Sequence, residues 1–226
     1  MKFTTIAAAF ATGATLMFAP GAHAQDTIKV GVIAPFSGPF ADYGKQMQGG
    51  INAWMAQHGD TVAGKKIQVI YKDTTGPAPE VAKRLAQELV VRDKVDFLAG
   101  FGLTPEALAV APIAQQSKTP MIIMNAATSV ITTKSDYIAR FSMTLPQISA
   151  PMADWADKNN IKTVATVVAD YGPGIDAEKA FSDRFVKNGG KVLEAIGMRF
   201  ARRLRIAGHD DDSLLYAAQA RGLARR

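Results

Sequence analysis

The sequence predicts an α/β fold in which a parallel sheet carries helices on both faces. Short apolar segments rich in β-branched residues alternate with longer segments whose apolar residues recur at helical spacing. Most of the short segments are nearly continuous in apolar residues, which is typical of parallel strands that are buried on both sides. Strands that alternate with helices of this length imply right-handed crossover connections.

The first group of elements lies within residues 25–145. Its expected strands are rich in Val and Ile and end in Gly, Pro or polar residues. They are residues 28–34, 66–71, 95–99, 120–124 and 137–141. Three helices are expected: the first begins near Asp42, the second covers residues 79–92 and the third covers residues 104–116. Pro112 is expected to kink the third helix.

A second strand–helix group occupies residues 146–198. Its expected helices are residues 148–159 and 176–188, and its expected strands are residues 163–168 and 191–196. Two parallel strands are too few for a sheet that is stable alone, and they leave open edges. This second group therefore predicts the beginning of a second lobe rather than a complete one.

The N-terminal residues 1–24 have the pattern of a secretory signal peptide. Lys2 precedes an apolar run over residues 6–19, and Ala22-His23-Ala24 fits a cleavage site of small residues. A membrane span is the alternative, but the run is short and Gly13 interrupts it. We therefore expect export to the periplasm.

The net charge of +6 comes mainly from residues 199–226, which hold seven Arg, three Asp and no Lys. Residues 25–198 are nearly neutral and prefer Lys to Arg, so they show no electrostatic footprint for nucleic acid. The abrupt change from Lys to Arg predicts that residues 199–226 are an aberrant basic tail, produced by a frameshift or truncation after about Met198. A genuine basic tail is the alternative.

Catalytic and metal-binding patterns are missing from residues 25–198. The sequence has no Cys, and His58 is the only His in this range, so neither a Ser-His-Asp nor a Cys-His arrangement can form. The acids lack calcium-loop spacing, and Gly100-Phe101-Gly102 is followed by Pro105 where a dinucleotide site needs a third small residue. We expect no enzyme, no cofactor and no metal; a flavodoxin-like enzyme is the alternative.

Three of the expected strands end in small or hydroxyl-bearing residues. Ser37 follows the first strand, Thr104 and Pro105 follow the third, and the segment 125–129 follows the fourth. Ligands of open parallel sheets bind beyond the carboxyl ends of the strands, so these loops predict a binding site. Each loop alone could equally be a turn or a helix start, as Thr104-Pro105-Glu106 illustrates.

Several spaced segments resemble a known family. They are "IKVGVIAPFSGPFADYGKQMQGGINAW", "YKDTTGPAPEVAKRLAQELV", "VDFLAGFGLTPEALAVAPIAQQSKTPMIIMNAATS", "YIARFSMTLPQ" and "VADYGPG". In this order they resemble the leucine/isoleucine/valine-binding proteins of ABC importers. The resemblance implies the type I periplasmic binding fold, in which two α/β lobes clamp a ligand. It implies a complete first lobe, an incomplete second lobe, and an inner-membrane ABC permease as partner.

The resemblance also implies which residues hold the ligand. We expect the set to combine aromatic, hydroxyl and amide side chains with small residues that let a ligand approach closely: Ser37, Tyr43, Thr104, Pro105, Asn125, Ala126, Thr128 and Tyr171. Pro105 stands where the amino-acid-binding members favour a hydroxyl-bearing residue, and it also lacks an N–H. An aromatic or other organic acid is therefore a candidate ligand beside a branched-chain amino acid. With its second lobe incomplete, we expect this chain to bind weakly or not at all. A ligand-sensing receptor of the same fold is the alternative function.

Overall fold

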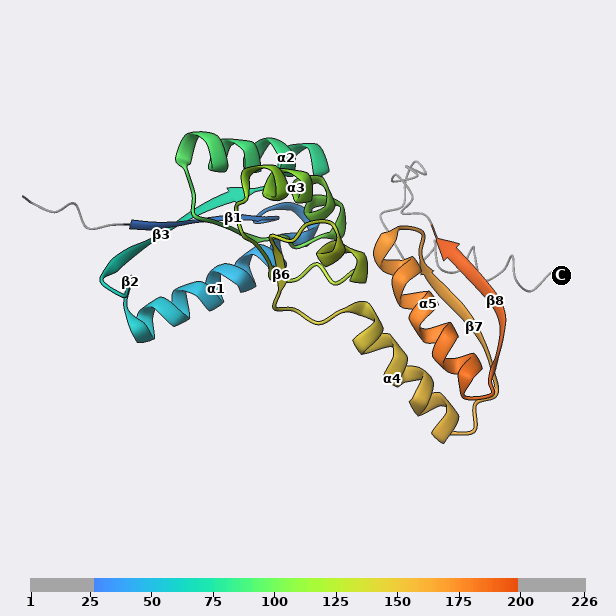
Figure 1. Ribbon diagram of the computed structural model, residues 1–226. Helices are drawn as coiled ribbons and strands as arrows, with labels where there is room; N and C mark the ends of the chain where they lie inside the picture. Colours follow the sequence, from blue (N-terminus) through green and yellow to red (C-terminus); the bar gives the residue numbers. More distant parts are fainter. Residues whose placement is uncertain (1–26, 199–226) are drawn as a thin grey trace, which may run out of the picture.

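The computed structural model describes residues 27–198. The predicted signal peptide (residues 1–24) and the predicted basic tail (residues 199–226) lie outside the described residues. The described chain forms two parts, each with its own sheet (Figure 1). We call the part from β1 to β6 the first lobe and the part from α4 to β8 the second lobe.

The first lobe contains a six-stranded sheet with the order β2-β3-β1-β4-β5-β6. Its strands are β1 (Thr27–Ala34), β2 (Thr61–Val62), β3 (Lys65–Asp73), β4 (Phe97–Gly100), β5 (Met121–Ile123) and β6 (Ile138–Arg140). All neighbouring pairs are parallel except β2 and β3. The five predicted strands of the first lobe are therefore confirmed as β1, β3, β4, β5 and β6. Their order in the sheet places β1, β4 and β5 side by side.

The predicted parallel sheet is confirmed, and it carries one further strand at its edge, where β2 and β3 form an antiparallel hairpin. Ala63 and Gly64 make its two-residue turn, and both have positive φ angles, of 49° and 76°. Such paired positive angles are typical of the turns that match the twist of a hairpin. An Ala-Gly pair is a weaker turn signal than Asn-Gly, which explains why the sequence did not reveal this strand.

Helices cover both faces of the first sheet, with α1 on one side and α2 and α3 on the other (Figure 1). Their bounds are α1 (Ala41–His58), α2 (Pro79–Gln87) and α3 (Thr104–Ser117). The predicted second helix continues beyond α2 as a wider π-helical turn, Glu88–Asp93, that ends at left-handed Lys94. Shorter 3-10 helices are Gly38–Phe40 and Ser129–Thr133.

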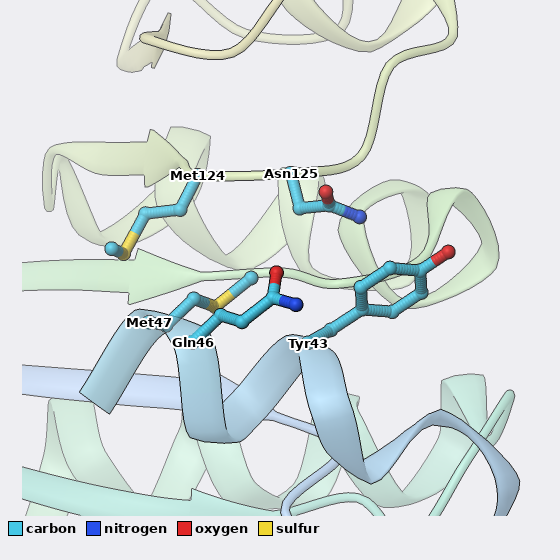
Figure 2. Close-up of a pocket in the computed structure, with 5 residues that line it drawn as sticks. All are labelled: Tyr43, Gln46, Met47, Met124 and Asn125. Carbon is cyan, nitrogen blue, oxygen red and sulfur yellow. The ribbon is translucent and has the colours of Figure 1, made fainter. Parts of the chain in front are cut away.

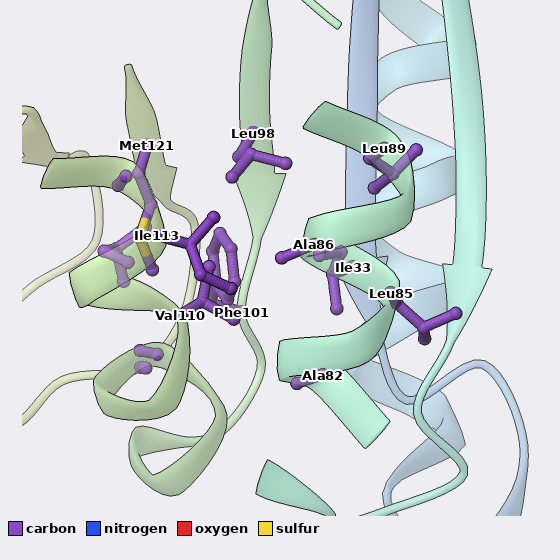
Figure 3. Close-up of a cluster of buried hydrophobic side chains, with 14 of the residues drawn as sticks. Ile33, Ala82, Leu85, Ala86, Leu89, Leu98, Phe101, Val110, Ile113 and Met121 are labelled. Carbon is purple, nitrogen blue, oxygen red and sulfur yellow. The ribbon is translucent and has the colours of Figure 1, made fainter. Parts of the chain in front are cut away.

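The main hydrophobic core lies between the first sheet and the pair α2 and α3 (Figure 3). Ile33 and Leu98 from the strands meet Leu89 and Val110 from the helices, and all four are fully buried. Phe101 fills the centre of this cluster directly after β4. The core therefore holds the loop that follows β4 in place, and Thr104 lies only three residues further on.

The second lobe consists of α4 (Leu145–Lys158), β7 (Thr163–Ala169), α5 (Gly172–Lys187) and β8 (Lys191–Met198). A capping box starts α4, in which the Thr144 hydroxyl accepts from the Gln147 N–H and the Gln147 side chain accepts from the Thr144 N–H. Helix α5 starts at Gly172, four residues before the predicted start. Gly174 permits this, because a Cβ there would lie 1.9 Å from the Ala169 carbonyl oxygen.

None of the helices within residues 27–198 is both long enough and apolar enough to cross a membrane.

Candidate functional site

The first lobe brings the predicted loops to a single edge of the sheet. Strands β1, β4 and β5 are neighbours and run parallel, so their carboxyl ends point the same way. The loops that carry Ser37, Thr104 and Thr128 follow these three strands directly. The structure therefore agrees with the expectation that small and hydroxyl-bearing residues gather where ligands of parallel sheets bind.

Thr104 and Thr128 form the centre of this edge. Their hydroxyl oxygens lie 2.7 Å apart, and both residues are almost completely buried. One hydroxyl donates to the other, so the accepting hydroxyl keeps its own hydrogen for a further partner. Buried Ala126 donates its N–H to the Phe101 carbonyl at 2.9 Å, which ties the 125–129 segment to the core.

A pocket of about 230 Å³ lies between α1 and the end of β5. Figure 2 shows Tyr43, Gln46 and Met47 projecting from α1 toward Met124 and Asn125. The Asn125 amide donates to the Gly102 carbonyl at 2.8 Å, which fixes the orientation of its side chain. The lining combines thioethers, amides and a phenol, so it offers both apolar contact and hydrogen-bonding groups.

The second lobe reaches this edge through the start of α5. Burial raises the pKa of the Tyr171 phenol, and charge on Tyr43 would raise it further, so the two phenols lie within electrostatic range. A Cβ built on Gly172 would lie 3.7 Å from the Thr104 methyl group. Tyr43, Thr104 and Tyr171 therefore come from three separate elements to one place.

Ser37 lies at the same edge, but its hydroxyl is already engaged. It donates to Asp73 at 2.6 Å, and Asp73 also accepts from the N–H groups of Phe36, Ser37 and Thr75. Burial tends to raise the pKa of Asp73, but these hydrogen bonds outweigh it and lower the pKa. Asp73 thus joins the ends of β1 and β3 in a role that the sequence did not reveal.

Pro105 is the second residue of α3, a helix position that tolerates proline because its missing N–H has no partner within the helix. It contributes no N–H donor to the site.

Glu106 is a fully buried carboxyl two residues after Thr104. Burial raises its pKa to about 7, although the Thr74 hydroxyl and the N–H groups of Leu103 and Ala78 lie near enough to oppose that rise. None of these groups reaches hydrogen-bonding geometry with either carboxylate oxygen. The burial of Glu106 was not predictable from the sequence, because an acid in the first turn of a helix is ordinary and usually solvated.

The sequence missed three residues of the pocket, Gln46, Met47 and Met124. Gln46 and Met47 lie three and four positions after Tyr43, so helical spacing places them on the face that carries Tyr43. That spacing was the signal that could have found them. Within the described range, 27–198, the acids and His form no cluster that could hold a metal ion.

A family model described as "Periplasmic binding protein" matches residues 27–222. The chain belongs to this periplasmic binding protein family. The match continues into the segment predicted to be an aberrant tail. The family is one of binding proteins, in agreement with the prediction that the chain is not an enzyme.

Relatives and solved structures agree with this membership. The chain is 50% identical to Leu/Ile/Val-binding protein homolog 6 of Brucella abortus over 188 residues, which are 83% of this chain and 48% of the relative. It is also similar to a solute binding protein of an ABC transporter from Rhodopseudomonas palustris BisB5, solved with 3,4-dihydroxybenzoic acid. That match has 53% identity and a TM-score of 0.75, and covers 79% of this chain and 49% of the other.

A second solute binding protein, from Rhodopseudomonas palustris HaA2, was solved with p-hydroxybenzoic acid. It is 48% identical with a TM-score of 0.77, and the match covers 87% of this chain and 52% of the other. A leucine binding protein of Thermotoga maritima, 24% identical with a TM-score of 0.72, shares the fold. The chain spans about half the length of the relatives it matches. The predicted type I periplasmic binding fold is confirmed.

Proposed function

We propose that this chain belongs to the solute-binding component of an ABC importer, and that it holds a small organic acid at the edge where the two lobes meet. The observation that carries the proposal is the buried pair of Thr104 and Thr128 hydroxyls, 2.7 Å apart, beside the Asn125 pocket. This pair keeps one hydroxyl hydrogen for a ligand oxygen. In this proposal the phenols of Tyr43 and Tyr171 contact the rest of the ligand.

An aromatic acid suits this site better than a branched-chain amino acid. The two solved relatives at 53% and 48% identity hold hydroxylated benzoic acids. Pro105 offers no N–H, and the pocket of about 230 Å³ is lined by groups that favour a flat ring: two Met side chains, one Tyr and two amides. Ser37, Ala126 and Pro105 then shape the loops, while Tyr43, Asn125, Thr104, Thr128 and Tyr171 contact the ligand.

Delivery to an inner-membrane ABC permease in the periplasm is part of the same proposal. It rests on the family and on the resemblance of the N-terminus to a signal peptide. A branched-chain amino acid is the second candidate ligand, since a relative at 50% identity carries the Leu/Ile/Val-binding name.

Isothermal titration calorimetry on the full chain tests the proposal with 4-hydroxybenzoate, 3,4-dihydroxybenzoate and leucine. We expect saturable heat with a hydroxybenzoate and weaker or no heat with leucine. Thr128→Val keeps the shape of the side chain but removes the hydroxyl. It should lower the affinity at least tenfold, which corresponds to a loss of about 1.4 kcal/mol in binding free energy. Absence of heat with all three compounds at millimolar concentration would overturn the proposal.

A further inference from the structure

Two hydrogen bonds to one α5 side chain join the lobes beside the ligand loop, in addition to the backbone bond from the Leu145 N–H to the Ala127 carbonyl where the chain enters α4. Asp176, on α5 of the second lobe, accepts from the Ser129 N–H at 2.8 Å and from the Ser129 hydroxyl at 2.7 Å. Ser129 belongs to the first lobe and lies 47 residues earlier in the sequence. One carboxylate thus binds both donors of one residue, and hydrogen bonds to an ionised acceptor are stronger than neutral ones.

The same loop is also held by Arg140, at the end of β6. Its Nη2 donates to the Thr128 carbonyl at 2.7 Å. Its Nε and Nη1 are buried and reach no hydrogen-bond acceptor. Burial lowers the pKa of this guanidinium, and the negative charge of Asp176 opposes that effect.

The Thr128-Ser129 segment is therefore fixed by three partners from different elements. Thr104 contacts the Thr128 hydroxyl, Arg140 holds the Thr128 carbonyl, and Asp176 holds Ser129. Of these, only Asp176 comes from the second lobe. Separation of the lobes would remove it, which would return Ser129 to water and leave the desolvated Arg140 charge without its nearby counter-charge.

We propose that Asp176, Ser129 and Arg140 form an interlobe latch that favours the closed arrangement and holds the Thr128 loop in its ligand-binding position. Asp176 and Arg140 act through this loop, so they are positioning residues. Only the expected effect of the latch on ligand affinity rests on the proposed function. The latch itself requires no ligand, because all of its contacts are between protein groups.

The chain has no Cys, so two spin labels can be placed without removing native residues. Lys83→Cys on α2 and Lys187→Cys on α5 introduce exposed labels, one in each lobe. Double electron–electron resonance on the full, ligand-free chain then measures the distribution of distances between the lobes. We expect one dominant short distance in the parent protein.

Asp176→Ala removes both hydrogen bonds and should raise the ratio of long to short distances several-fold. Ser129→Ala removes only the hydroxyl bond and keeps the N–H bond, so it should raise the ratio by a smaller factor. The double variant should match Asp176→Ala, because loss of the carboxylate already removes the hydroxyl bond. Asp183→Ala is the matched control, since Asp183 lies on α5 but pairs with exposed Lys179 within the helix. Distributions for Asp176→Ala and Ser129→Ala that match this control would overturn the latch.

Ligand titrations separate this result from the proposed function. Thr128→Val should lose affinity for 4-hydroxybenzoate while its ligand-free distances stay those of the parent. Asp176→Ala should lose affinity and change the distances together, while thermal melting confirms that it is folded. If the parent chain binds no solute but Asp176→Ala still changes the distances relative to the parent, the proposed function is refuted and the latch stands.

Discussion

The first lobe and the second lobe use the same strand–helix order but bury their residues very differently. In the first lobe, six strands carry helices on both faces, and the core extends from Ile33 to Ile131. In the second lobe, two strands are covered by α5, against which α4 packs, and the buried core consists of Ala153, Ala156 and Phe185. The parallel order alone therefore does not decide how much core a lobe has.

The uncovered side of the second lobe explains this difference. Thr166 of β7 faces α5, where its hydroxyl contacts Glu178, so the neighbouring Val167 points the other way and is 53% exposed. Along α4, Ile148, Met152 and Trp155 form an exposed apolar stripe. Parallel strands normally have both faces covered. Within residues 27–198 the second lobe thus has one covered face, and we expect it to be the less stable lobe.

The largest expected effect is loss of the first-lobe core. Phe101 is fully buried between the sheet and α2 and α3, and Phe101→Ala should lower the free energy of unfolding by about 3–5 kcal/mol. Urea denaturation followed by circular dichroism measures this. Phe141→Ala is the matched control, because Phe141 is 81% exposed and its truncation should change little. Equal effects of the two substitutions would contradict the core described here.

The next effect is a pH dependence that arises only in the first lobe. Because burial raises the pKa of Glu106 from 4.5 to about 7, the folded state holds this proton more tightly than the unfolded state. Stability should therefore fall as pH rises from about 4.5 to about 7, and level off above that. Each pKa unit corresponds to about 1.4 kcal/mol, so the loss should reach about 3 kcal/mol.

Glu106→Gln should remove most of this dependence, because the amide cannot ionise. Glu80→Gln is the control, since Glu80 is an exposed acid in the first turn of α2. Urea denaturation at pH 5 and pH 8 gives the difference for each variant. A parent protein equally stable at both values would show that the Glu106 carboxylate is better solvated or paired than its surroundings indicate.

The matched substitution in the second lobe should have a more local effect. Phe185 is 1% exposed and stacks on Phe181 with ring centroids 5.5 Å apart. Phe185→Ala removes the largest buried side chain of this small core, so residues 145–198 should lose protection from hydrogen exchange while residues 27–140 keep theirs. Mass spectrometry of the exchanged peptides measures both regions. Loss of protection in both lobes together would show that they unfold as one unit.

Much of the fold could be predicted from the sequence, because apolar spacing reports directly on burial. The strands of the first lobe and the helices α1 and α3 followed from this spacing. The β2–β3 hairpin did not, because its strand β2 has two residues and its Ala63-Gly64 turn is a weak signal. The early start of α5 was missed because Gly172-Pro173-Gly174 resembles a loop, whereas here proline and small residues begin the helix.

The site was predictable only in part. Hydroxyls at the ends of parallel strands indicated Thr104 and Thr128, whose contact the structure contains. Charged residues were harder to interpret, because their role depends on partners that are distant in sequence. Asp176 lies 47 residues from Ser129, and Asp73 lies 36 from Ser37. No local sequence pattern indicates such pairs, so the roles of Asp73, Arg140 and Asp176 can be recognised only in the folded structure.

The smallest effect should come from an ion pair that joins α4 and α5. Asp154 accepts from Arg184 at 2.6 and 3.0 Å and from Asn188 at 2.8 Å. The Arg184 hydrogen bonds, followed by that of Asn188, lower the pKa of Asp154 from 3.8 to about 2. The contribution of this pair to stability is therefore complete above about pH 4 and is lost as pH falls toward 2.

Asp154→Asn should remove this acid-dependent part and leave the second lobe slightly less stable at neutral pH. The fluorescence of Trp155, in a Trp54→Phe background, reports on α4 during titration between pH 5 and 2. Asp157→Asn is the control, because Asp157 pairs with exposed Lys162 outside the α4–α5 contact. If both variants titrate as the parent does, acid loosens this lobe through other groups, and its weakness lies in the uncovered sheet rather than in the helix pair.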